Sequence, residues 1–512
     1  MLDYYKKTKT LFKSVAWIAY SNFVVRRNIR FLNQINQSKE DKTNPIKNLI
    51  LPILESNHYQ IFHLLILAKV MELRGYKITV IACDEALTGC EIKSSTSFDS
   101  RLTCLRCTTN RKTLLPLFKF EIKLISQIIK YDEIVFSEED EIFVADSVSR
   151  YFYGGHKEAP TRRSKRVTNS HRLTAGISRS IGRYINRTYE NGIILNNMNV
   201  YSLWGPLFRE IDSNRFVTSI LSYSAFDVNT VRFNIVDLFR SRERFSIFRS
   251  NRISEKLSEA EGKALDEFLK KRRNGKDTLF SEWKLYSHEQ SILFDKSVRN
   301  IVLFPNIPWD VGLNEFTGIY DNVFEWLEDT IDFCGVDESV VVWIKIHPGE
   351  VKGTSPSKVS VYDWLSRCVL PSNVRVIPPG LSVSPYQLFK DMDLGVVFSG
   401  TLGLEMLNAG VPVVSTGIPP YKDLEFGLQP QNRSEYRDMI FNGKFHASEV
   451  PAIRLFSYFY FIFLSKRWPF TTRAFGQRFD GYSFQDFDSF LASNREDVDR
   501  LCQLVESGGV DH

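Results

Sequence analysis

Residues suited to binding an anion occur in the segment 397–414, VFSGTLGLEMLNAGVPVV. An apolar strand is predicted to enter a turn that contains Ser399, Gly400 and Thr401, and a helix follows. Amides at a helix start carry partial positive charge, and glycine lets an anion come close to the backbone. Glu405, in the first helical turn, would accept hydrogen bonds from a ribose diol. The pattern predicts a nucleotide-phosphate site; the alternative is an ordinary strand–turn–helix.

A second group of polar side chains follows another apolar run about fifty residues upstream. The segment VVVWIKIHPGE ends at Lys345, His347 and Glu350. In open α/β sheets, ligands bind at the carboxyl ends of the strands, so both groups are predicted to line one crevice. The alternative for His347 is a structural histidine at the end of a strand.

The composition is that of a folded protein with ordinary charge. The chain has 512 residues, 43% hydrophobic and 25% charged, with a net charge of +6. This length permits two or three domains. No apolar run reaches the length of a membrane-spanning helix, and no signal peptide is recognisable, so we expect a cytoplasmic protein, soluble or peripheral to the membrane.

Two stretches without acidic residues, 4–38 and 161–188, concentrate positive charge. Residues 1–40 alternate Lys and Arg with aromatic and aliphatic residues, a pattern typical of a basic amphipathic helix that lies on an anionic membrane; packing on the protein itself is the alternative. Residues 161–188 carry eight Lys and Arg and are interpreted as a solvated, partly mobile loop. No motif for binding nucleic acid accompanies either segment.

Alternating strand and helix patterns predict an α/β fold with two Rossmann-like domains facing across a cleft. The first domain is assigned to residues 41–290 and the second to 291–455. Residues 456–512 are assigned to C-terminal helices that pack back on the first domain. Ser258 and Glu261 form a capping-box pattern before a polar helix that suits a connection between domains.

The C-terminal half resembles GT-B glycosyltransferases of bacterial capsule and surface-polysaccharide synthesis, in particular Kdo- or sialyltransferase-like families with an HP motif. The matching segments are FPNIPWD (304–310), EWLEDTI (325–331), KIHPGE (345–350), RVIPP (375–379) and SGTLGLEMLNAGVPVV (399–414). They cover about 120 residues, and the N-terminal half matches only loosely.

The resemblance implies a nucleotide-sugar donor in the second domain. His347 would contact the donor phosphate, and Lys345 and Glu350 would flank the leaving group or the nucleotide. Ser399 and Thr401 would hold phosphate oxygens, and Glu405 the ribose. Donors aimed at the departing nucleotide stabilise its growing negative charge without a metal, and no catalytic cofactor is predicted.

Three further residues are candidates for the remaining roles. Asp310, after the strand in PNIPWD, is predicted to bind donor or acceptor, or to cap a helix. The acceptor hydroxyl needs a general base, for which His58 and Asp146 are the candidates. His63 is interpreted as a core histidine.

Four of the seven cysteines, Cys83, Cys90, Cys104 and Cys107, lie within 25 residues. The C-x2-C half of the group has the spacing of a metal knuckle, so a structural Zn²⁺ site is one prediction, and unligated thiols or redox chemistry are the others. A cytosolic location argues against disulfides.

The leading functional hypothesis is a glycosyltransferase that moves a sugar from a nucleotide-sugar to a surface polysaccharide or lipid-linked glycan. A teichoic-acid-type polyol-phosphate transferase, which has a similar K-x-H-P segment, is one alternative. A non-catalytic GT-B relic that binds nucleotide or glycan is another. A nucleotide-sugar 2-epimerase is disfavoured because the chain has FSGT where a DSGG-like turn is expected.

Overall fold

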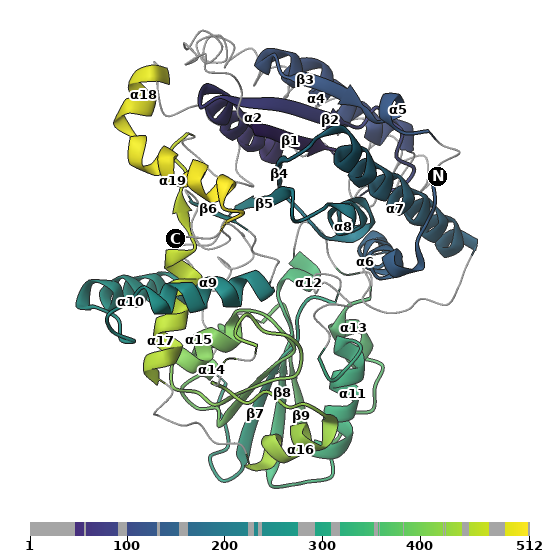
Figure 1. Cartoon of the computed structure of the whole chain (residues 1–512). Coiled ribbons are helices and arrows are strands. Elements are labelled where there is room, and N and C mark those ends of the chain that lie inside the picture. Colours follow the sequence, from purple (N-terminus) through teal and green to yellow (C-terminus); the bar gives the residue numbers. More distant parts are fainter. Residues whose placement is uncertain are drawn as a thin grey trace. The chain divides into compact units, whose positions relative to one another are not determined.

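The computed structural model of the chain (Figure 1) divides into two compact units. Unit 1 comprises Met1–Tyr151, Pro160–Arg244 and Ser465–His512, and unit 2 comprises Phe152–Ala159 and Phe245–Leu464. The structure describes residues 47–55, 58–90, 100–130, 134–152, 162–223, 230–233, 238–274, 292–308, 318–352, 357, 359–381, 383–422, 424, 426–442, 450–470 and 487–509. The two α/β units confirm the predicted fold class, whereas the chain changes units at 244/245 and 464/465, not at the predicted 290/291 and 455/456.

Unit 1 is built on a seven-stranded sheet with the order β12-β6-β5-β4-β1-β2-β3. The strands from β3 to β5 are parallel, and β6 and β12 add antiparallel pairs at one edge. The strands are β1 (Lys47–Ile53), β2 (Tyr76–Ala82), β3 (Glu121–Leu124), β4 (Gly192–Asn196), β5 (Phe216–Tyr223), β6 (Thr230–Phe233) and β12 (Lys466–Arg467). The chain order reverses between β1 and β4, which is where open α/β sheets bind ligands.

Helices cover both faces of this sheet. They are α2 (His58–Leu73), α4 (Ser100–Phe118), α5 (Ile125–Ile128), η2 (Glu138–Asp140), α6 (Glu141–Phe152), α7 (Arg162–Thr188), α8 (Tyr201–Glu210), α18 (Phe487–Ser493) and α19 (Arg495–Glu506). Leu49 and Leu51 of β1 pack in one core with α2 and α19, and Ile50 packs in a second core with α7 and α8. Burial on both faces explains why β1 is a continuous apolar run without alternation.

The basic segment 161–188 is a helix for most of its length, which corrects its interpretation as a loop. Helix α7 buries Ile177, Ile181 and Ile185 at helical spacing. Its cations are used inside unit 1: Arg172 pairs with Glu141, Arg179 with Asp140 and Glu210, and Arg183 with Glu210. Three of the eight cations in this run are therefore paired with acids that are distant in the chain.

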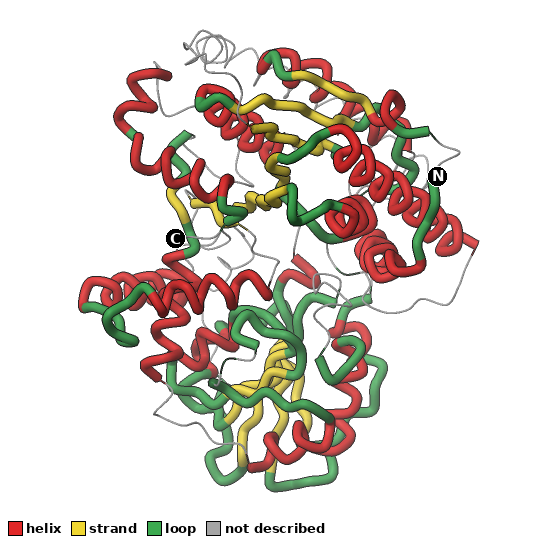
Figure 2. The backbone as a smooth tube through the Cα atoms, in the orientation of Figure 1, coloured by secondary structure: helices red, strands yellow, loops and turns green. Residues whose placement is uncertain are grey.

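Unit 2 contains a five-stranded parallel sheet with the order β11-β10-β7-β8-β9, which Figure 2 shows among helices and loops. Its strands are β7 (Arg299–Phe304), β8 (Val340–Lys345), β9 (Val374–Ile377), β10 (Leu394–Val397) and β11 (Val413–Ser415). Its helices are α10 (Glu259–Arg273), α11 (Val323–Cys334), α12 (Gly349–Lys352), α13 (Val361–Leu365), α14 (Pro385–Leu388), α15 (Leu402–Asn408), α16 (Arg433–Asn442), α17 (Val450–Tyr458) and the π-helix η5 (Phe459–Phe463). The chain order reverses between β7 and β10.

Helix α10 belongs to unit 2, although the sequence placed it in the first domain. Its predicted capping box forms: the Ser258 hydroxyl accepts from the Glu261 amide, and the Glu261 carboxylate accepts from the Ser258 amide. Asp266 pairs with Arg454 of α17, and the ring of Phe268 stacks on Phe461. These contacts attach the helix to the C-terminal part of unit 2.

Aromatic side chains join the two ends of unit 2. Helix α9 (Leu238–Ser250) carries Phe245 and Phe248, whose rings lie 5.2 Å from the ring of Phe459. Phe248 also lies 4.6 Å from Phe463.

Among the described helices, none combines the length and apolarity required to cross a membrane.

Candidate functional site

The central feature of the candidate site is a hydrogen bond between two segments that follow neighbouring strands of unit 2. The Ser399 amide, just after β10, donates to the Asn306 side-chain oxygen, just after β7, at 3.2 Å. This bond spans the point where the strand order reverses. Ligands bind in open α/β sheets at such a point, so the turn 399–401 occupies the expected position.

Gly400 gives the turn a conformation that other residues rarely adopt. Its φ is +111°, and a Cβ placed there would lie 3.3 Å from the Asn306 Nδ2 atom. Helix α15 begins at Leu402 and has only seven residues, without a side-chain cap from Thr401. The Ser399 amide already has a partner in Asn306, so the predicted cradle of three free amides is not present as such. The predicted cradle is thus reduced to the amides of Gly400 and Thr401, and all three turn residues are half-buried.

His347 lies after β8, on the same edge of the sheet. Its Nδ1 accepts a hydrogen bond from the Gly349 amide at 3.0 Å, which places the proton of the neutral ring on Nε2. Burial and the neighbouring Lys345 charge lower the pKa of His347 from 6.5 to about 4. At neutral pH, His347 is therefore an uncharged ring that carries its proton on Nε2.

The segment after β7 brings the two groups together. Asn306 bonds to Ser399, and the next residue, Ile307, lies against Gly349, where a Cβ would come within 2.9 Å of its Cδ1 atom. The same Cβ would lie 3.0 Å from the His347 Nδ1 atom. Since β7 separates β8 from β10, the two turns are two strand spacings apart, about 10 Å. The predicted juxtaposition of the imidazole and the Ser399 turn is thus consistent with the sheet order and with these contacts.

Lys345 is buried at the end of β8. It is 4% exposed, and its ammonium donates to the Ile346 carbonyl at 3.2 Å. Burial lowers the pKa of Lys345 to about 8. The side chain is mostly charged at neutral pH, so it makes the local potential favourable for an anion.

Glu350 is also buried and connects two short helices. It is 1% exposed, and its Oε2 accepts from the Val361 amide at the start of α13 at 2.7 Å. Its Oε1 is buried with no hydrogen-bond partner among the described residues. Burial raises the pKa of Glu350 to about 8. The group is largely protonated at neutral pH, so it does not oppose a bound phosphate, and its contacts position the α12–α13 segment.

Glu405 has a different environment from the one the sequence predicted. It is 3% exposed, and both of its carboxylate oxygens have partners within unit 2. Arg272 of α10 donates to Oε1 at 2.9 Å and 3.2 Å, and the Tyr386 hydroxyl donates to Oε2 at 2.6 Å. A carboxylate enclosed in this way is not open to a ribose diol, so we assign Glu405 to the packing of α10 and α14 against α15.

The candidates for the acceptor side are less well defined. Asp310 lies outside the described residues. His58 was predicted to lie in a loop but is the first residue of α2, and the side chain of His58 is outside the described part. Asp146 is on α6, 6% exposed, beside the buried Ser147. Its role as general base stays a prediction. His63 is buried, with its ring 4.6 Å from Trp468, as expected of a core histidine.

The four cysteines predicted as one alternative to hold a structural Zn²⁺ lie in unit 1. None of the seven cysteines is in a disulfide; Cys90 is buried, and Cys83, Cys104 and Cys107 are half-buried. Among the described residues, no group of three or more His, Cys, Asp or Glu side chains is arranged to hold a metal ion. Structural zinc on these four thiols stays a prediction, alongside unligated thiols and redox chemistry.

Sequence reasoning missed the residues that brace the site. Asn306 stands in the FPNIPWD segment, but only Asp310 was singled out there. Arg272 lies in the basic run Lys270–Arg273, and basic residues are common at the C-terminus of any helix, so the run does not single out Arg272. Tyr386 belongs to no recognisable motif. Nothing in the sequence pairs Arg272 with Glu405, which is 133 positions away.

Comparisons with known proteins give structural neighbours only. No family model matches the chain, and no curated protein matches it. The solved structures that match include two of KpsC from Thermosulfurimonas dismutans. The first is described as a beta Kdo 2,4 transferase and is 15% identical in sequence. The match covers 52% of this chain and 78% of the KpsC chain, with a TM-score of 0.33. The beta Kdo 2,7 transferase is 12% identical, covers 63% and 87%, and has a TM-score of 0.34.

Anabaena Alr3699/HepE in complex with UDP-glucose also matches, at 12% identity, with 90% of this chain and 100% of that chain covered and a TM-score of 0.27. Two of these neighbours are thus described as Kdo transferases and the third as a complex with UDP-glucose. At these TM-scores, function has to be inferred from the side chains of the chain itself. The chain is an α/β protein with two sheets rich in parallel strands.

Proposed function

We propose that the chain is a glycosyltransferase that binds a nucleotide-sugar in unit 2 and transfers the sugar to a surface polysaccharide or lipid-linked glycan. The observation that carries the proposal is the common position of His347 and the Ser399 turn at the carboxyl edge of one parallel sheet, linked through Asn306 and Ile307. The proposed ligand of this edge is the diphosphate or monophosphate of the donor.

The proposed mechanism relies on hydrogen bonding to the leaving nucleotide. When the bond from the anomeric carbon breaks, the departing phosphate oxygen gains negative charge. The neutral His347 ring would donate its Nε2–H to this oxygen, while the Gly400 and Thr401 amides would hold another phosphate oxygen. Lys345 would add a buried positive charge. We propose that these donors suffice without a metal ion, and turnover in excess EDTA would test this.

The test uses the full chain with CMP-, UDP-, GDP- and CDP-linked sugars. A true donor should raise the melting temperature by mass action, and nucleotide should be released. His347→Ala should lower the release rate by about 10²- to 10³-fold, the effect of removing one donor to a developing oxyanion. His347→Asn, which keeps an N–H, should retain part of the rate.

Unchanged nucleotide release by His347→Ala would refute the assignment. Stabilisation by a nucleotide without any turnover would instead support the non-catalytic alternative. Release of a nucleoside monophosphate from a CDP-polyol would indicate the teichoic-acid type of transfer.

We also propose that the protein works in the cytoplasm at the inner face of a membrane, because residues 1–40 combine basic and aromatic side chains. Co-sedimentation with vesicles should require anionic lipid and should weaken in high salt. Equal binding to neutral vesicles would contradict an electrostatic contact.

A further inference from the structure

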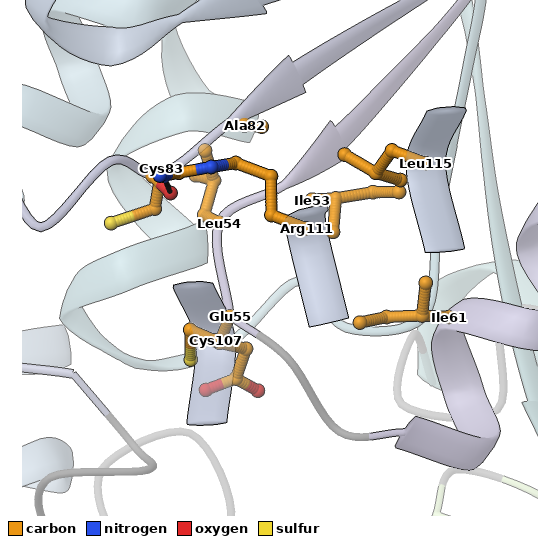
Figure 3. Close-up of a pocket in the computed structure, with 9 residues that line it drawn as sticks. All are labelled: Ile53, Leu54, Glu55, Ile61, Ala82, Cys83, Cys107, Arg111 and Leu115. Carbon is orange, nitrogen blue, oxygen red and sulfur yellow. Dashed lines mark hydrogen bonds between the residues drawn. The ribbon is translucent and has the colours of Figure 1, made fainter. Parts of the chain in front are cut away.

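The thiol-lined pocket of Cys83 and Cys107, at the carboxyl ends of β1 and β2 in unit 1, is too small for a sugar. Its cavity of about 10 Å³ has room for about one water. Figure 3 shows the Arg111 side chain of α4 extending toward Cys83, with Leu115 and Ile61 on the other side. The Arg111 guanidinium donates to the Cys83 carbonyl at 2.6 Å, so it braces the end of β2.

In unit 2, Asn306 stands at the centre of the candidate site. It lies two residues beyond β7, the strand between β8 and β10. The turns of His347 and Ser399 are two strand spacings apart, about 10 Å, and a hydrogen bond spans about 3 Å. One ligand atom therefore cannot accept from both turns. A donor at the end of β7 fills the interval between them.

The side-chain amide of Asn306 has a defined orientation. The Ser399 amide donates to it at 3.2 Å, and only the oxygen of a side-chain amide can accept. The Nδ2 atom therefore forms the other end of the group, beside Gly400. A Cβ on Gly400 would lie 3.3 Å from Nδ2, and no other atom of the described residues beyond the adjacent ones comes within 4 Å of that position. The glycine thus leaves space beside Nδ2.

The Nδ2 group of Asn306 also has unused hydrogen-bonding capacity. It carries two N–H donors. Within the described part of the chain, neither donor is used, and Nδ2 is not one of the enclosed polar atoms that lack a partner. Asn306 and Gly400 are both half-buried. The amide therefore offers a donor that a ligand can reach.

The charges at this sheet edge favour an anionic acceptor for that donor. Lys345 is buried and donates to the Ile346 carbonyl, and it forms no ion pair with a described residue. Glu350 is largely protonated at neutral pH because burial raises its pKa to about 8. Glu405 is paired with Arg272. An uncompensated positive charge thus lies beside a neutral donor, which suits a phosphate oxygen.

We propose that Asn306 binds a phosphate oxygen of the nucleotide-sugar through Nδ2–H, between the His347 turn and Gly400. This inference rests on the proposed function and adds a residue to the donor site. The two ends of the amide have different roles: Oδ1 fixes the Ser399 turn, and Nδ2 contacts the ligand.

Two substitutions separate these roles. Asn306→Asp keeps an acceptor for the Ser399 amide but replaces the donor by an oxygen, whereas Asn306→Ala removes both. Isothermal titration calorimetry of the full chain with CMP, CDP, UDP and GDP would give the Kd. For the nucleotide that the parent protein binds best, both variants should raise the Kd about 10- to 100-fold, as expected for loss of a hydrogen bond to a charged group.

A matched control tests for a general effect of charge. Asn251→Asp makes the same chemical change at an exposed position of unit 2 and should leave the Kd unchanged. A loss in Asn251→Asp equal to that in Asn306→Asp would overturn the proposal. If Asn306→Ala lowers the melting temperature, Asn306→Asp, which retains the bond to Ser399, decides alone.

Two further results would assign Asn306 a different role. Parental affinity in Asn306→Asp, with a loss in Asn306→Ala, would mean that the side chain only positions the Ser399 turn. The nucleoside of the same nucleotide, followed by ligand-observed NMR, should bind the parent protein and Asn306→Asp equally. An equal loss for the nucleoside would place Asn306 at the ribose or base. Either result would refute the phosphate contact.

Failure of this inference is distinguishable from failure of the proposed function. A parent protein that binds none of the four nucleotides would contradict both. Nucleotide binding and sugar transfer that Asn306→Asp leaves unchanged would contradict the role of Asn306 alone.

Discussion

The two units carry different chemistry at equivalent places in their sheets. In unit 2, the carboxyl ends of the strands carry His347, Lys345 and the Ser399 turn, all suited to a phosphate. In unit 1, the corresponding ends of β1 and β2 carry Glu55 and Cys83 beside Arg111 of α4. A parallel α/β sheet fixes where a ligand can bind, but the side chains at the strand ends decide which ligand it is.

The two sites are also stabilised in different ways. Unit 2 holds its turn through a buried network that joins α10, α14 and α15, with Arg272, Tyr386 and Glu405 as its members. Unit 1 holds Arg111 mainly through a bond to the backbone of β2. We therefore expect the phosphate-type site to be more sensitive to single substitutions than the thiol-lined pocket.

The largest expected effect concerns the buried ion pair. The pair between Arg272 and Glu405 is 11% and 4% exposed, so Arg272→Ala leaves an uncompensated buried carboxylate and should destabilise unit 2 by about 3–5 kcal/mol. Urea unfolding of the full chain, followed by tryptophan fluorescence, measures the change. The double replacement Arg272→Met with Glu405→Leu should recover much of the loss. A single variant as stable as the parent protein would show that the network does not brace the turn.

The next effect is a dependence of the stability of unit 2 on pH. The pKa of Glu350 is raised to about 8 from 4.5, so between these values the folded state holds a proton that the unfolded state has lost. Stability should therefore fall as pH rises through this window, by at most about 1.4 kcal/mol per pH unit. Glu350→Gln, which keeps an acceptor for the Val361 amide, should flatten this fall.

His347 and Lys345 also contribute to the dependence of stability on pH. The contribution of Glu350 is therefore the difference between the pH profiles of the parent protein and of Glu350→Gln. The pKa of His347 is lowered from 6.5 to about 4, so the parent protein loses stability as pH falls through that range. The lowered pKa of Lys345 changes the stability only above about pH 8. Both effects persist in Glu350→Gln. Identical pH profiles for parent and variant would contradict the raised pKa of Glu350.

A smaller effect distinguishes binding from backbone strain. Gly400 and Gly410 both have positive φ, at +111° and +79°, so alanine at either position should cost about 1–2 kcal/mol. Only Gly400 faces Asn306 in the proposed phosphate turn, whereas a Cβ at Gly410 meets nothing within 4 Å. Isothermal titration with the donor nucleotide should show weaker binding for Gly400→Ala alone. Equal affinities would place the phosphate elsewhere.

The smallest expected effect concerns metal in unit 1. Since the described residues contain no group arranged to hold a metal ion, a chelator should leave the melting temperature unchanged, and zinc measured by mass spectrometry should be well below one per chain. Stoichiometric zinc that is lost in Cys83→Ser would contradict this expectation and support the predicted zinc site.

The sequence predicted the parts of the molecule that depend on local patterns. Apolar runs located strands such as β1 and β8, because burial on both faces leaves a continuous hydrophobic signal. The capping box at Ser258 was predictable for the same reason, since both partners lie within four residues. The positions of His347 and Ser399 at one sheet edge followed from the rule for parallel strands.

Long-range partners were not predictable. In the sequence, Arg172, Arg179 and Arg183 belong to a basic run without acidic residues. Their acidic partners lie 27 to 39 positions away along the chain and meet them only in the folded unit. It shows Glu405 as an available carboxylate, while Arg272 encloses it from another helix. Pairing energy depends on proximity in space, which the spacing of residues along the chain does not reveal.

The aromatic packing at the ends of unit 2 has a practical consequence. Phe245 and Phe248, near the start of the segment 245–464, contact Phe459 near its end, so this segment of unit 2 begins and ends at nearby points. Residues 245–464 thus have the layout of an inserted cassette. A short glycine-rich bridge should close these ends into a circular permutant, or replace the whole segment, without stretching the backbone.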